Sequence, residues 1–502
     1  MLTSAKLLIG SVALAATLAI GTSAFAQQTN QTQSQQNQSQ QGQTQQGQTQ
    51  QKPLDTRVNP PANSSSDTSD SGQVTPDTHS LSGAETYGVG GIGHSYFLPS
   101  LQFAEYADTN DSFAGSSANL EPVTQVGGQL LYKKIRSRQD FTVQYSGGGV
   151  FYDRGSASNY TYQQMGISEK YSWRRASIQL SDYFSYLPDS GYGAGGFGTS
   201  FAGGPPGLFG IGGIPFGLNP GFLSDQSIFT AFARRYDNSS FGEFDYQLSP
   251  RSSVTATGGY DMLHFFDSSL FNSHTYIFRG GYNYQATAKS TISFIYTGTL
   301  FRYNQFSADN FQVHIGQAAY GRRITGRLGL QLAAGPQVIV PLTGKNIYSW
   351  TVNSSLRYAW QRADVAVEYN RFTNNGGGIY FGAYANEFRL AGDRRVSRAW
   401  TVNANIAYAR NTPIPLGVIA NGTLNSYDSI YAGVSASRPV GRYISAFANY
   451  NFQWQSQGFC SIGFVCGPSF TRHVFGVGFN WNFRPIGSPE DLFHAISAGK
   501  AR

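Results

Sequence analysis

Residues 348–369 read YSWTVNSSLRYAWQRADVAVEY, two alternating segments joined by a short turn that contains Arg362. Tyr348, Trp350 and Val352 share one parity, and the residues between them are polar. Side chains on a strand point to opposite faces with period two, so this stretch predicts a hairpin with one apolar and one polar face.

The bulk composition narrows the class of protein. Charged residues make up only 13% of the 502 residues, against roughly a quarter in soluble proteins. The mean hydropathy is nevertheless −0.30, and no apolar run reaches the ~20 residues of a spanning helix. A membrane barrel reconciles the two observations, because only alternate residues of its strands face lipid.

Alternating segments like the first recur from residue 100 to residue 483, and short Arg-containing turns alternate with longer loops. They predict an all-β fold, a transmembrane antiparallel up-and-down β-barrel of about 18 strands (16–18). In such barrels the short turns lie on the periplasmic side.

The tryptophans fall beside the two predicted rims on the apolar parity, where amphipathic rings form aromatic girdles. The alternative is ordinary strand-end aromatics in a soluble sheet. The predicted girdle residues are Trp350, Trp360, Trp400, Trp454 and Trp481.

The last alternating strand, residues 475–483, ends on Phe483. Its Gly478, Phe479, Trp481 and Phe483 resemble the C-terminal targeting strand of Gram-negative outer-membrane β-barrel proteins, porin-like in architecture. The resemblance implies outer-membrane lipid and the barrel-insertion machinery as partners. Two departures are Gly476, where a polar residue is common, and about twenty residues that follow Phe483.

The rest of the chain divides by composition. Residues 1–26 have the pattern of a cleaved signal peptide, which indicates export to the cell outer membrane. Residues 27–80 are a Gln/Asn/Ser-rich leader, expected to be disordered, which is either a periplasmic spacer or partner-binding arm or a solvated leader. A pre-barrel segment covers 81–99, and the tail 484–502 is predicted to be a short helix or a frayed end.

The net charge is +7, but the arginines cluster at turns rather than in one patch, so nucleic acid is not an expected partner. On the polar parity, both signs occur, which predicts either a transverse field in the lumen or ion pairs that brace the wall. These candidate lumen charges are Lys133, Glu243, Asp245, Asp261, Arg279, Arg327, Arg357, Asp364, Glu368, Glu387 and Arg389.

The loop at residues 188–222 mixes glycine with aromatic residues and a Pro-Pro pair. One interpretation is a constriction loop folded into the barrel mouth; the other is an ordered cap or an adhesive surface loop. The candidate constriction residues are Phe197, Phe201, Pro205, Pro206, Phe209 and Phe216.

The cysteines, histidines and glycine-rich motifs of this sequence indicate no reactive site. Cys460 and Cys466, in one predicted loop, are a candidate disulfide in an oxidising compartment. The seven histidines form no recognised metal motif, and two Gly-x-Gly-x-x-Gly matches lack a following helix. We therefore expect no catalytic, metal or cofactor site, and no enzyme.

The function that this sequence favours is a porin-like channel for passive diffusion of small polar solutes. The alternative is a structural or adhesive outer-membrane barrel, or the outer-membrane component of a polymer export system. The sequence carries no signal for the transported solute or the oligomeric state.

Overall fold

A computed structural model describes residues 95–109, 120–153, 158–187, 234–268, 270–304, 307–360, 362–397, 399–416, 426–441, 443–456 and 469–483. All of them fall within the unit Asn59–Arg502. The predicted signal peptide, leader, tail, disulfide and 188–222 loop lie outside the described residues, and so do all but a few residues of the pre-barrel segment.

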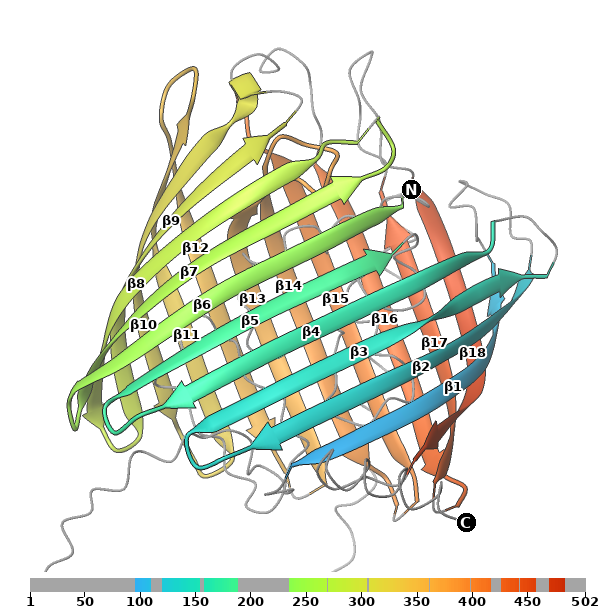
Figure 1. Cartoon of the computed structure of the whole chain (residues 1–502). Coiled ribbons are helices and arrows are strands. Elements are labelled where there is room, and N and C mark those ends of the chain that lie inside the picture. The colour runs from blue at the N-terminus through green and yellow to red at the C-terminus, as the bar shows by residue number, and fades with distance from the viewer. Residues whose placement is uncertain are drawn as a thin grey trace, which may run out of the picture. The chain divides into compact units, whose positions relative to one another are not determined.

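The described residues form one 18-stranded antiparallel sheet (Figure 1). The strands are β1 (Tyr96–Asp108), β2 (Glu121–Ile135), β3 (Gln139–Tyr152), β4 (Tyr160–Ser172), β5 (Ala176–Leu187), β6 (Arg235–Ser249), β7 (Ser252–Phe265), β8 (Ser273–Thr287), β9 (Ser290–Tyr303), β10 (Phe311–Arg323), β11 (Leu328–Pro341), β12 (Ile347–Ala359), β13 (Ala363–Asn374), β14 (Ala383–Arg395), β15 (Thr401–Pro413), β16 (Tyr427–Pro439), β17 (Ile444–Gln455) and β18 (Phe470–Asn482). A 3₁₀ turn, η1 (Ser307–Asp309), precedes β10.

The sheet closes on itself. Each strand pairs with its sequence neighbours, and β1 pairs with both β2 and β18, in a register that joins Ser100 to Asn482 and Asp108 to Val474. Closure leaves no unpaired edge, which a membrane interior requires. The predicted fold class and strand number are confirmed; the first strand begins at Tyr96, slightly before the expected start.

Short turns on one rim share a local hydrogen bond from a backbone N–H to a side-chain hydroxyl. In the β6–β7 turn, Arg251 donates its backbone N–H to Ser249 Oγ at 3.2 Å, and in the β8–β9 turn Lys289 donates to Thr287 Oγ1 at 3.2 Å. A Ser or Thr hydroxyl two residues before the donor stabilises a tight turn. These two turns therefore share a sequence pattern, in which a Ser or Thr stands two residues before a basic residue.

Three loops on the opposite rim share a hydrogen bond to an asparagine side chain. Asn159, Asn272 and Asn310 each accept, through Oδ1, the backbone N–H of the strand residue seven positions earlier, at 2.7–2.8 Å. The amide side chain thus satisfies a strand-end donor that would otherwise lack a partner in the sheet. Each of these loops is closed at its base.

The two faces of the wall differ as the period-two pattern predicts. Large apolar side chains such as Phe103, Phe278 and Phe294 are exposed on the outside, whereas Gln125, Thr257 and other polar residues of the opposite parity are buried on the inside. Among the described residues, no helix is long and apolar enough to cross a membrane. The wall has an outer surface suited to lipid and a polar interior.

Candidate functional site: the lumen and the loop that crosses it

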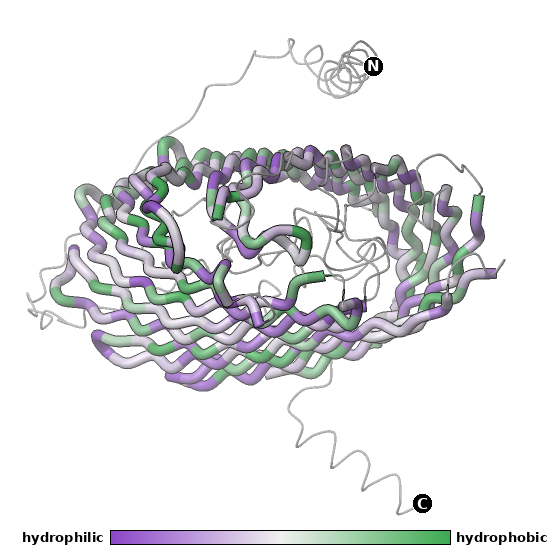
Figure 2. The backbone as a smooth tube through the Cα atoms, turned by 90° about the horizontal axis from the view of Figure 1, so that it is seen from above, coloured by the Kyte–Doolittle hydropathy of each residue, from purple (hydrophilic) through white to green (hydrophobic). Residues whose placement is uncertain are grey.

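The loop between β13 and β14, residues 375–382, lies inside the barrel; we call it the strap. Viewed from above, described loop segments lie within the outline of the wall (Figure 2). The strap's Asn375 donates from Nδ2 to Ser273 Oγ at 2.8 Å, and Phe271 donates its N–H to Gly378 O at 2.8 Å. Since Ser273 is an inward-facing residue at the start of β8, the strap reaches across the lumen to a wall several strands away.

Apolar packing holds the strap in place. Ile379, Tyr380 and Phe381 are each at most 8% exposed, and they pack against inward-facing aromatic and aliphatic residues of the upper wall. Phe381 stacks on Phe271 with ring centroids 4.1 Å apart. Full burial of each such side chain is worth about 1.5–3 kcal/mol and offsets part of the entropy lost when the loop is ordered. Burial also raises the pKa of the Tyr380 hydroxyl above its ordinary value.

Glycine makes the strap's path possible. Gly376, Gly377, Gly378 and Gly382 all have positive φ, between 60° and 97°. That backbone region suits glycine, and a Cβ at Gly378 or Gly382 would also collide with a phenylalanine ring on the wall. The Gly-rich sequence is thus the condition for bringing the backbone close to the wall.

The strap was not identified from the sequence. The predicted constriction at 188–222 lies outside the described residues, and its residues stay a prediction. Residues 375–382 carry the same composition, three glycines followed by Ile-Tyr-Phe-Gly. That similarity is the one signal that could have pointed to them.

Below the strap, the inner face of β12–β14 carries a chain of charged groups. Arg357 donates from Nε to both carboxylate oxygens of Asp364 at 3.0 Å. Arg389 lies between two carboxylates, with Nη2 at 3.1 Å from Glu387 and Nη1 at 3.9 Å from Glu368. The structure brings together the five residues predicted here on the polar parity.

A second charged region lies on the inner face of β6–β8. Asp261 accepts from Ser239 Oγ at 2.6 Å, and Asp245 accepts from Thr255. At mid-height the register places Glu243 beside Thr257 and Thr257 beside Arg279. Four more of the predicted lumen charges are therefore on the inner wall.

The two remaining predicted charges differ in position. Lys133 faces inward near the short-turn rim and forms an ion pair with Asp140 at 3.3 Å. Arg327 is exposed in the turn before β11, because that strand begins only at Leu328. It belongs to the rim and not to the lumen, a correction to the predicted set.

The predicted girdle tryptophans lie on the outer surface near the rims. Trp350, Trp360, Trp400 and Trp481 are exposed, and Trp454 is partly buried beside the long-loop rim. Arg371 lies over the Trp350 ring, 4.3 Å from its centroid. Such a pair suits a boundary where one partner contacts lipid and the other water.

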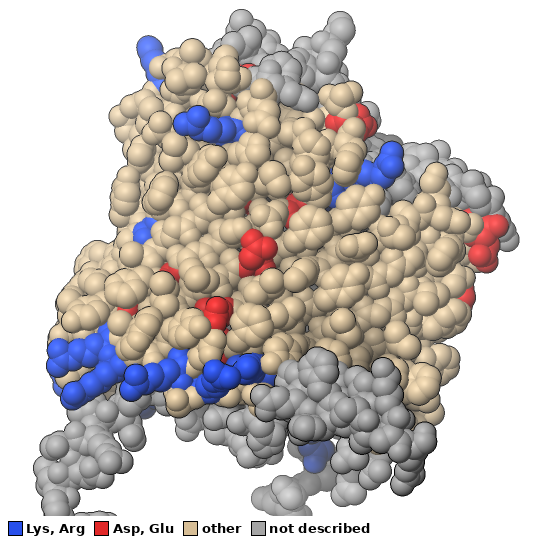
Figure 3. Space-filling model, in the orientation of Figure 1, with Lys and Arg blue, Asp and Glu red and all other residues tan. Residues whose placement is uncertain are grey.

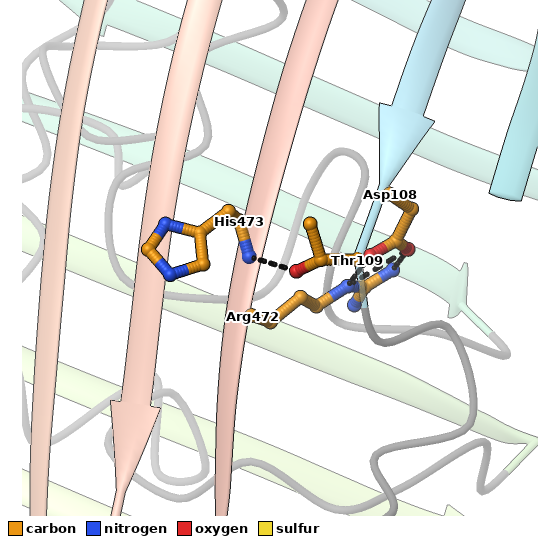
Figure 4. A network of polar contacts seen from close by, with 4 residues as sticks. All are labelled: Asp108, Thr109, Arg472 and His473. Atoms are coloured by element: carbon orange, nitrogen blue, oxygen red, sulfur yellow. Dashed lines mark hydrogen bonds and ion pairs between the residues drawn. The ribbon is translucent and has the colours of Figure 1, made fainter. Parts of the chain in front are cut away.

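The barrel seam holds the most buried charges of the described chain. Arg472 on β18 donates to Asp108 on β1 from Nε at 3.0 Å and from Nη2 at 2.6 Å, and both side chains are fully buried (Figure 4). The residues that follow this pair in the sequence are bonded as well: His473 donates its N–H to Thr109 Oγ1 at 2.9 Å. Sequence reasoning missed this pair, because its partners are far apart in the chain.

The predicted targeting strand forms the other side of the same seam. Phe479 and Trp481 face outward and are exposed, while Gly478 faces inward against the β1 backbone. Trp481 stacks on Phe483 with centroids 5.3 Å apart. Within the described residues, no group of three or more His, Cys, Asp or Glu side chains is arranged to hold a metal ion.

No protein-family model matches the chain, and no curated protein matches it. Among solved structures, it is similar to Acinetobacter baumannii OccAB3, with 9% identity over 78% of this chain and 100% of that chain and a TM-score of 0.39. Similar figures hold for Pseudomonas aeruginosa OpdQ, with 9% identity, 79% and 100% coverage and a TM-score of 0.41. Pseudomonas aeruginosa OpdK gives 8% identity, 77% and 99% coverage and a TM-score of 0.39.

The closed wall has an apolar outer face and a polar inner face. These features make the described chain a β-barrel of the outer-membrane type, porin-like in architecture.

Proposed function

We propose that this protein is an outer-membrane channel through which small polar solutes diffuse passively. The observation that carries the proposal is the closed 18-stranded wall whose inner face is polar. A barrel of this size is wide enough to hold an aqueous path, whereas an eight-stranded barrel is filled by its own side chains.

The strap narrows the lumen of the proposed channel. It occupies part of the lumen at the long-loop end, where its apolar residues pack against the upper wall. Below it, inward residues of β12 and β13 such as Ser355 and Glu368 are only partly buried, as expected for groups that meet water and solute. Diffusion over such a surface requires no cofactor and no catalytic residue.

The remaining features belong to the same proposal. Residues 1–26 are removed as a signal peptide, and the strand ending at Phe483 engages the barrel-insertion machinery. The outer tryptophans form the lipid–water girdles, Cys460 and Cys466 form a disulfide, and the protein is not an enzyme.

Liposome swelling tests the function directly. Vesicles containing the full chain should swell in sugars of small size and stop swelling as the sugar grows, because the strap limits the free path. Vesicles prepared identically without the protein are the control. Absence of swelling with every sugar would overturn the channel and favour a structural or adhesive barrel.

A further inference from the structure

In this chain, the described basic side chains gather mainly outside the lumen. Its net charge is +7, yet basic side chains line the short-turn rim, visible as a row along the lower edge of the molecule (Figure 3). The described basic residues at the turns and strand ends of this rim are Lys134, Arg136, Arg138, Arg174, Arg175, Arg251, Lys289, Arg322, Arg323, Arg327, Arg362, Arg394, Arg395 and Arg438.

The inner wall has the opposite balance. Among described strand residues of inward parity, leaving out the strand-end Arg323 and Arg395, there are eleven carboxylates and seven basic groups, an excess of four. The carboxylates are Asp108, Glu121, Asp140, Asp237, Glu243, Asp245, Asp261, Asp364, Glu368, Glu387 and Asp393. The basic groups are Lys133, Lys170, Arg235, Arg279, Arg357, Arg389 and Arg472. Adding the two strand-end arginines still leaves carboxylates in excess.

The excess is confined to two sectors of the wall. On β6–β8 four of these carboxylates accompany two arginines, and on β12–β14 four more accompany two arginines. The rest of the inner wall is balanced, three against three, and includes the Asp108–Arg472 and Lys133–Asp140 ion pairs. The acidic sectors are also the two that the strap connects, since it leaves the wall at β13 and bonds to Ser273 on β8.

The contacts within β12–β14 show why the arginines do not cancel the excess. Arg389 contacts Glu387 and Glu368 together, so one positive charge serves two negative ones. Arg357 binds Asp364, whose register partner on β14 is a further carboxylate, Asp393. The group around Arg389 carries a net charge of −1, and Asp393 is also near the strand-end Arg395.

These groups lie on the inner wall between the strap and the short-turn rim. The Debye length at physiological ionic strength is about 8 Å, so charges on the wall of a narrowed lumen are only partly screened. Rings of carboxylates in pores attract cations and repel anions.

We propose that the lumen is selective for cations, and that the carboxylates of β6–β8 and β12–β14 set this preference. The inference rests on the proposed channel function and names its favoured solutes: small inorganic and organic cations. The basic residues of the short-turn rim lie at the end of the barrel opposite the strap.

Zero-current potentials across a planar bilayer, measured with the full chain in a KCl gradient, test the inference. We expect the sign of a cation-preferring pore, with a K⁺ over Cl⁻ permeability ratio of about two or more. The double variant Glu368→Gln with Asp393→Asn should reduce that ratio by about half, because it removes two carboxylates from the lumen. Neither side chain is fully buried, so the barrel should tolerate both changes.

The matched control is Glu105→Gln with Asp182→Asn, which removes two carboxylates from the outer face, where they bond to Thr124 and Ser240. Its permeability ratio should equal that of the unaltered chain. A channel that conducts without preference, or that prefers Cl⁻, overturns the inference and leaves the channel function intact. An unchanged ratio in the Glu368/Asp393 variant overturns it as well, whereas absence of any conductance overturns the proposed function itself.

Discussion

Removal of the strap should raise the single-channel conductance roughly twofold or more, because a segment that occupies the lumen would be replaced by open water. The change is simple to make: Asn374 and Ala383 are register partners at the end of the β13–β14 ladder. A two-residue Asn-Gly turn in place of residues 375–382 can therefore join the strands as an ordinary hairpin. Conductance in planar bilayers is the measurement, and the size limit in liposome swelling should rise with it.

A matched control separates removal of the strap from mere shortening of a loop. The β11–β12 connection can be shortened by the same turn in place of residues 340–346, because Ile339 and Ile347 are register partners, and the space around its Gly344 is open. This variant should conduct like the unaltered chain. The milder substitution Gly378→Ala, which forces a Cβ against Phe265 at positive φ, should give an intermediate rise. Equal conductance in all these variants would mean that the strap does not limit the pore.

Breaking the ion pair at the seam should have the largest effect on stability. Asp108→Ala leaves the Arg472 guanidinium, which is fully buried, without its carboxylate. Loss of one partner of a buried pair costs about 3–5 kcal/mol, most of it from the uncompensated charge. Urea unfolding of the barrel in lipid vesicles measures this difference in free energy.

Two further variants decide whether charge is the cause. Asp108→Leu combined with Arg472→Met removes both charges and should recover much of the loss, since an apolar pair of similar size needs no counter-charge. Asp428→Ala breaks the pair with Arg410, whose side chains are 55% and 30% exposed, and should cost only about 0–1 kcal/mol. If Asp108→Ala proved as mild as Asp428→Ala, the seam would not depend on its ion pair.

The wall could be predicted from the sequence because its signal is local. In residues 348–369 the alternation that predicts a hairpin is the same alternation that places Trp350 outside and Arg357 inside. A residue's face follows from its parity, so nearly all the predicted lumen charges lie on the inner wall. Arg327 is the exception, because parity has no meaning once a strand has ended.

The strap and the seam could not be predicted, because they depend on contacts between distant residues. Asn375 and Ser273 are 102 residues apart, and no periodicity records which loop turns inward. Glycine with aromatics is a necessary composition for such a loop, but residues 188–222 share it. Composition indicates which loops could enter a lumen, but the contacts with distant residues of the wall determine whether a loop binds there.

The seam has a consequence for how this protein is made. Asp108 and Arg472 are 364 residues apart, so the first strand emerges from the ribosome long before its partner exists. Until then the first strand has one edge open and a carboxylate without its guanidinium. The chain cannot complete itself progressively from one end, and assembly must wait for the final strand. Closure of the barrel thus joins the two ends of the wall, and long-range contacts of this kind form slowly.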